Sequence, residues 1–151
     1  MSERKKILII EDDICVIDFL KYALEKEGFI INISADGIQG IKLIGKTAPD
    51  LIILDMMLPG KSGYEIIKIL QAGEYNQIPI VIVTGRFAED SYKKMLLDEP
   101  NVKEFIIKPI RIQFLLNSIY SILNIIPAEQ IKVQEKRKKP EEETDPWKIN
   151  I

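Results

Sequence analysis

Short apolar runs alternate with segments of helical periodicity along most of this chain. The first run, residues 6–10, is rich in β-branched side chains, which is typical of a strand buried on both faces. Apolar residues then recur at helical spacing as far as Gly28, a residue type that commonly ends helices. The expected strands are residues 6–10, 29–33, 51–54, 80–83 and 103–107, and the expected helices begin near residues 14, 36, 62, 88 and 112.

This alternation predicts the fold class. Strands that alternate with helices form parallel βαβ units with right-handed crossovers, and helices then cover both faces of the sheet. We therefore expect an α/β domain over residues 1–126, built as a doubly wound five-stranded parallel sheet of the (βα)5 type.

The composition changes after residue 126. A basic run at 136–139 precedes an acidic run at 141–143. Residues 127–151 hold too few apolar side chains to offset the entropy lost on ordering, so we expect a flexible charged tail. A helical extension over 129–139 is the less favoured alternative. Trp147, the sole tryptophan, is a candidate for a contact with the domain or with a partner.

Composition and charge exclude several classes of protein. The 151 residues include no histidine and one cysteine, Cys15, which excludes Ser-His-Asp and Cys-His hydrolases, zinc fingers and an intrachain disulfide. The net charge of −2 argues against direct nucleic-acid binding. No apolar run is long enough for a signal peptide or a membrane span. We therefore expect a cytoplasmic protein without membrane or nucleic-acid partners.

Chemically useful residues follow four of the five predicted strands. Ligands of open parallel sheets bind at the carboxyl ends of the strands, so these residues should meet at one edge. Crowded carboxylates repel one another unless a cation lies between them, and oxygen ligands suit Mg²⁺, Mn²⁺ or Ca²⁺. The acids, together with an ammonium and a hydroxyl, would suit a phosphoryl group. The residues are Glu11, Asp12, Asp13, Asp55, Thr84 and Lys108.

Each of these residues also has an ordinary structural interpretation. Asp13 is expected to cap the following helix, and Asp55 could be a turn former ahead of Pro59 and Gly60. Only their joint placement at four strand ends favours a functional site, in which Asp55 could act as a nucleophile.

The chain from residue 5 to about residue 125 resembles the receiver domain of two-component response regulators. Four segments carry this resemblance: ILIIEDD at 7–13, PDLIILDMMLPGKSG at 49–63, PIVIVTG at 79–85 and FIIKP at 105–109. The resemblance implies a flavodoxin-like (CheY-like) arrangement of the sheet.

The resemblance also implies roles for individual residues. It makes Asp55 the phosphoacceptor, with Thr84 and Lys108 in contact with the phosphoryl group and Phe105 as a switch aromatic. It implies a Mg²⁺ cofactor, with Mn²⁺ as an alternative ion, whose ligands are Glu11, Asp12, Asp55 and the backbone carbonyl of Met57.

The function implied by the resemblance is signalling rather than enzymatic turnover. A sensor histidine kinase or a phosphotransfer protein would donate a phosphoryl group to Asp55, and the domain would contribute its own autophosphorylation and autodephosphorylation chemistry. A changed protein-binding surface would then engage a downstream protein target. Residues 115–119 lack the Arg that receivers of the transcription-factor type use for pairing, so we expect a monomer or weak dimer.

Two positions are expected to lengthen the lifetime of the phosphorylated state. Met57 lies two residues after Asp55, and its side chain cannot orient an attacking water molecule. Arg86, two residues after Thr84, is long enough to shield the site or to pair with a phosphoryl oxygen.

Three other interpretations remain open from the sequence. The chain could be a receiver-like binding module that works without phosphorylation, although the expected acids and Lys108 are all present. It could be an aspartyl-phosphate hydrolase, although Met57 stands where such enzymes usually carry a second Asp. It could also be a receiver fragment of a hybrid kinase.

Overall fold

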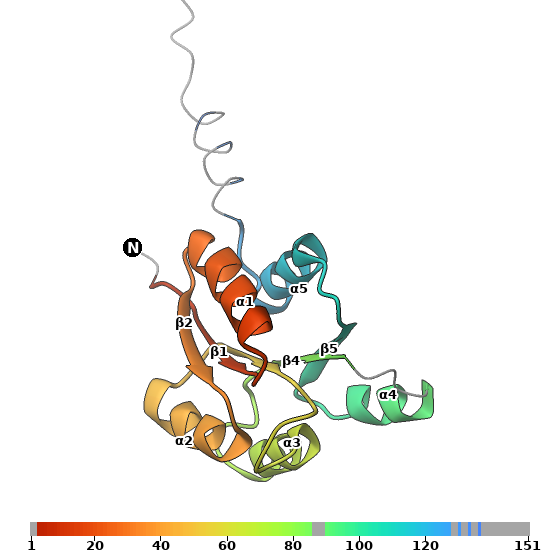
Figure 1. Cartoon of the computed structure of the whole chain (residues 1–151). Coiled ribbons are helices and arrows are strands. Elements are labelled where there is room, and N and C mark those ends of the chain that lie inside the picture. Colours follow the sequence, from red (N-terminus) through yellow and green to blue (C-terminus); the bar gives the residue numbers. More distant parts are fainter. Residues whose placement is uncertain (1–2, 86–89, 128–129, 131–132, 134–135, 137–151) are drawn as a thin grey trace, which may run out of the picture.

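The computed structural model describes residues 3–85 and 90–127, together with residues 130, 133 and 136. Five parallel strands form one sheet in the order β2-β1-β3-β4-β5, so the predicted α/β fold is confirmed (Figure 1). The strands are β1 (Lys6–Ile10), β2 (Ile30–Ser34), β3 (Leu51–Leu54), β4 (Ile80–Thr84) and β5 (Val102–Ile107). The helices are α1 (Ile14–Lys26), α2 (Gly37–Thr47), α3 (Gly63–Ala72), α4 (Asp90–Leu97) and α5 (Ile112–Leu123).

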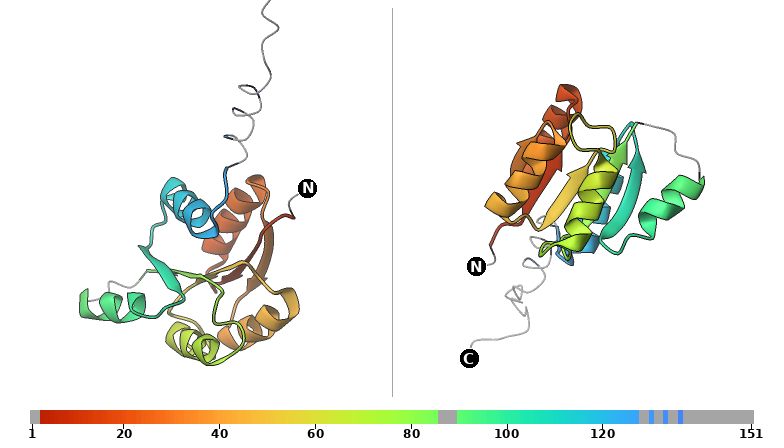
Figure 2. Two further views of the ribbon diagram at one scale, coloured as in Figure 1. Left: turned by 180° about the vertical axis from the view of Figure 1, so that it is seen from behind. Right: turned by 90° about the horizontal axis from the view of Figure 1, so that it is seen from below.

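Helices cover both faces of the sheet. Helices α1 and α5 lie on one face, and α2, α3 and α4 lie on the other (Figures 1 and 2). Side chains of β1 alternate between the two cores: Ile7 and Ile9 pack toward α1 and α5, whereas Leu8 and Ile10 pack with α2 and α3. All four are fully buried, which is why this strand is a continuous apolar run.

The helix ends follow local sequence signals. The Asp13 carboxylate accepts hydrogen bonds from the N–H groups of Cys15 and Val16, which confirms it as the cap of α1. The Ser62 hydroxyl accepts a hydrogen bond from the N–H of Glu65 in the same way at the start of α3. Gly28 follows α1 with a φ of 95°, a conformation that glycine adopts without steric cost.

Boundaries differ from the prediction by one or two residues. Strand β4 includes Thr84, and α5 ends at Leu123 because Asn124 adopts the left-handed conformation. Residues 86–89 lie outside the described part of the chain, and so do Trp147 and most of the predicted tail. The proposed boundary at residue 126 therefore stays a prediction. Among the described residues, no helix is both long and apolar enough to cross a membrane.

The start of α3 lies against the backbone that leads out of β3. A Cβ atom on Gly63 would come within 2.7 Å of Met56 Cα and 2.8 Å of the Asp55 carbonyl oxygen. Both atoms belong to the main chain, so a side chain at this position would move the segment that carries Asp55. Gly45 in α2 has more room, because its nearest neighbour would be the Tyr75 hydroxyl at 3.7 Å.

We expect Gly63→Ala to lower the free energy of unfolding by about 1–3 kcal/mol, the usual cost of overpacking. Gly45→Ala is the matched control, and it should be neutral or raise stability by about 0.5–1 kcal/mol because a helix interior favours Ala over Gly. Urea denaturation measures both variants. Equal stability of the two variants would contradict the close contact at Gly63.

Candidate functional site

Two acids lie side by side where β1 and β3 end. The Asp55 N–H donates a hydrogen bond of 3.0 Å to the carbonyl of Ile10, so Asp55 extends the β3 pairing to a point beside Glu11. Glu11 and Asp55 are only 2% and 5% exposed, whereas Asp12 is exposed. One carboxylate oxygen from each of these three acids lies within 4.8 Å of the others. The structure thus brings together the acids that the sequence placed at one edge.

Lys108 provides the positive charge between the two buried acids. Its Nζ lies 2.8 Å from Glu11 Oε2 and 3.1 Å from Asp55 Oδ2. The Lys108 N–H donates to the carbonyl of Thr84 at 2.9 Å, which fixes the end of β5 against β4. The side chain therefore reaches from β5 past β4 to the acids of β3 and β1.

Backbone N–H groups hold the second oxygen of each buried carboxylate. Asp55 Oδ1 accepts a hydrogen bond of 3.0 Å from the N–H of Met57. Glu11 Oε1 accepts one of 3.1 Å from the N–H of Asp13. Each carboxylate thus has one oxygen on the main chain and the other on Lys108, which fixes its orientation.

Burial and charge act in opposite directions on this cluster. Burial raises the pKa of Glu11, and the neighbouring Asp55 raises it further, although Lys108 and the Asp13 N–H favour the charged form. Burial alone would lower the pKa of Lys108, but its hydrogen bonds to Glu11 and Asp55 and the charges of both acids leave that pKa raised. Lys108 therefore stays protonated and is the internal counter-ion of the site.

The other predicted site residues surround this cluster at different depths. Thr84 is 2% exposed at the end of β4, and Phe105 is 5% exposed in the core beneath α3 and α4. Met57 is 55% exposed, and Arg86 lies outside the described residues.

Sequence reasoning missed Lys93, whose Nζ lies 5.6 Å from the centre of the Phe105 ring. A lysine on a short helix carries no sequence signal for such a contact.

Replacing Lys108 by Met should lower the free energy of unfolding at neutral pH by about 2 kcal/mol, because two buried carboxylates lose their cation. Since the pKa of Glu11 is raised in the folded state, lowering the pH protonates the folded form first and relieves the repulsion. The difference in free energy of unfolding between the parent chain and this variant should therefore shrink as the pH falls from about 7 to about 5. Urea denaturation of this variant and of the control Lys42→Met tests this, and a deficit independent of pH would contradict it.

Known proteins resemble both the sequence and the fold. The chain is 30% identical over 133 residues to the DNA-binding response regulator MtrA of Mycolicibacterium paratuberculosis, a match that covers 86% of this chain and 57% of the relative. A CheY-like response regulator receiver domain protein from Methanospirillum hungatei JF-1 is 27% identical with a TM-score of 0.73, over 89% of this chain and 99% of that one. The receiver domain of a sensor histidine kinase from Pseudomonas aeruginosa PAO1, described with a magnesium ion in its active-site cleft, has a TM-score of 0.72 at 22% identity, over 81% of this chain and 99% of that one.

One expectation from the sequence is wrong. We expected no direct nucleic-acid binding because the net charge is −2, yet the curated relatives include DNA-binding response regulators. The chain spans 57% of the length of that relative, so the charge of the matched part does not report on the rest. Charge near zero in a receiver-like segment is therefore no argument against a DNA-binding protein.

The family model of the response regulator receiver domain matches residues 7–120. That range contains β1 except for its first residue, the other four strands, helices α1 to α4 and most of α5, as well as the acids, Thr84 and Lys108. The matched range, the sheet order and the solved relatives agree with one another. This chain therefore belongs to the response regulator receiver domain family, a family of signalling domains.

Proposed function

We propose that Asp55 accepts a phosphoryl group from the phosphohistidine of a sensor kinase or of a phosphotransfer protein. The supporting observation is the position of Asp55 Oδ2, which lies 3.1 Å from Lys108 Nζ at the end of β3. Two further acids lie within 4.8 Å, so the site also has the donors for a metal ion. A buried aspartate beside a lysine and two further acids is arranged for phosphoryl transfer rather than for a turn alone.

The transfer would form one bond and break another. An oxygen of Asp55 attacks phosphorus, the P–N bond to the donor histidine breaks, and an acyl phosphate remains on the protein. Lys108 would move from the carboxylates to a phosphoryl oxygen, and the Thr84 hydroxyl would donate to another. Both residues lie at the ends of neighbouring strands, so they can reach the same group.

Glu11, Asp12 and Asp55 would hold the Mg²⁺ ion, and the backbone carbonyl of Met57 would complete the set. Three carboxylate oxygens within 4.8 Å, without nitrogen or sulfur donors, suit a hard divalent ion. When bound, Mg²⁺ would supply charge neutralisation for the phosphoryl oxygens. Mn²⁺ prefers the same ligands and is the alternative ion.

Phosphorylation would be read out through Thr84 and Phe105. If Thr84 moves toward the phosphoryl group, the space that it leaves becomes available to Phe105, which alters the surface of α4, β5 and α5. Autophosphorylation from small donors and autodephosphorylation belong to the same proposal. Met57 would slow hydrolysis by covering the acyl phosphate, and Arg86 is assigned the same role from its sequence position.

Asp55→Asn should abolish labelling by acetyl phosphate with Mg²⁺, because a neutral amide oxygen is a far weaker nucleophile than a carboxylate oxygen. The matched control is Asp50→Asn, since Asp50 precedes the same strand at its opposite end and bonds the N–H of Lys6. Mass spectrometry should detect one added phosphoryl group in the parent chain and in the control. Undiminished labelling of Asp55→Asn would disprove the assignment.

Asp12 and Asp13 allow a contrast between a metal ligand and a helix cap. Asp12→Ala should weaken Mg²⁺ binding and raise stability in the absence of metal, because it removes one of three crowded negative charges. Asp13→Ala should instead lower stability by about 1 kcal/mol through loss of the α1 cap, and it should leave Mg²⁺ affinity nearly unchanged. Calorimetric titration together with thermal unfolding distinguishes the two, and equal Mg²⁺ affinities would count against the site.

A further inference from the structure

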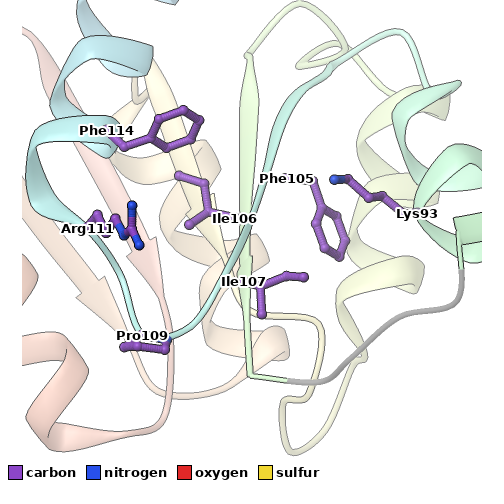
Figure 3. Close-up of a pocket in the computed structure, with 7 residues that line it drawn as sticks. All are labelled: Lys93, Phe105, Ile106, Ile107, Pro109, Arg111 and Phe114. Carbon is purple, nitrogen blue, oxygen red and sulfur yellow. The ribbon is translucent and has the colours of Figure 1, made fainter.

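A hollow of about 280 Å³ lies where α4, β5 and the start of α5 meet (Figure 3). Phe105, Ile107 and Phe114 line it. Ile107 and Phe114 are 42% and 51% exposed, although both are large apolar side chains. Exposed apolar side chains that gather around one hollow indicate a surface for another segment of protein.

Two cations flank this hollow. Figure 3 shows Lys93 on one side of β5 and Arg111 on the other. Among the described residues that line the hollow, none is acidic. A matching segment would therefore combine a large apolar side chain with several negative charges.

Two other hollows suit such a segment less well. The hollow of about 300 Å³ between the start of α1 and the β5–α5 connection has Lys108 as its cation, which is already bonded to Glu11 and Asp55. A third hollow carries Lys103 and Glu104, whose charges cancel. Among these three hollows, the one between Lys93 and Arg111 has two cations that are not bonded to Glu11 or Asp55 and no acid among its lining residues.

The chain itself contains a segment with this chemistry. Residues 141–147 read Glu-Glu-Glu-Thr-Asp-Pro-Trp, so the six residues before the sole tryptophan include four carboxylates. We infer that the Trp147 side chain occupies the hollow and that the carboxylates of residues 141–145 pair with Lys93 and Arg111. The sequence predicts a flexible tail but makes Trp147 a candidate for a contact with the domain or with a partner, and the inference selects the domain.

The size of the hollow agrees with this occupant. At about 280 Å³ it lies just below the roughly 300–1,000 Å³ of small-molecule sites, so it suits one large side chain. An aromatic side chain with little conformational freedom is also a common anchor of protein contacts. Burial of Trp147 would cover Ile107 and Phe114, whose exposure is otherwise unexplained.

The chain is also long enough. The hollow lies at the first turn of α5, and the 12 residues of that helix span about 18 Å. Twenty positions separate Pro127 from Trp147, and even if half of them were helical, ten extended residues would span about 33 Å. Tethering within one chain also gives the segment an effective concentration in the millimolar range. The contact needs no phosphorylation, so it is independent of the proposed function.

The tryptophan fluorescence of the chain reports on Trp147 alone, because the sequence contains no other tryptophan. In the full chain at low salt, we expect its emission to be blue-shifted and poorly quenched by acrylamide. Lys93→Glu with Arg111→Glu should lower the docking equilibrium constant by about tenfold, as expected for two exposed ion pairs, and should expose the indole. The matched control is Lys42→Glu with Lys46→Glu on α2, which changes the net charge equally and should leave the emission unaltered.

A second variant tests the same contact from the tail. Replacing Glu141, Glu142 and Glu143 by Gln leaves the folded domain unchanged and should also release Trp147. The inference is overturned if Trp147 in the parent chain is quenched as readily as in urea, or if the α2 control releases it equally. It is also overturned if protection of Trp147 rises with protein concentration, which would assign the hollow to a second copy.

Discussion

Two carboxylates buried side by side are the constraint on which this molecule depends. Glu11 and Asp55 are almost inaccessible to water, and the strands that they follow, β1 and β3, are neighbours in the sheet. Such a pair is stable only if a positive charge compensates it. Lys108 does so at 2.8 and 3.1 Å, which requires β5 to end at the same edge of the sheet as β1 and β3. The parallel topology meets this requirement because all strands point the same way.

The same arrangement explains why the site can respond to charge. Lys108 contacts both acids. A cation bound at the site would compete with Lys108 for the acids, and a phosphoryl group would compete with the acids for Lys108. The backbone holds the acids in place meanwhile, through the N–H groups of Met57 and Asp13. Two acids that share one cation form a local electrostatic element of the kind that can bias a two-state surface.

The surface formed by α4, β5 and α5 lies two strand positions from the strand that ends at Asp55. Phe105 is buried in β5, three residues before Lys108, and its ring lies under Lys93 of α4. The hollow beside it is lined by Phe105 itself, so movement of this ring would reshape the hollow. A segment seated there, whether from the tail or from another protein, would therefore be sensitive to the state of the phosphoacceptor site.

The sequence by itself determined the fold class, the strand ends and the acids, because these depend on local periodicity and on where parallel strands deliver their next residue. It also identified the cap Asp13, since capping involves residues two or three positions apart. Only the tertiary structure decided that Lys108 pairs with both Glu11 and Asp55, because this pairing spans three neighbouring strand spacings and more than fifty residues of sequence. The hollow between α4 and α5 likewise arises from packing and has no local signal.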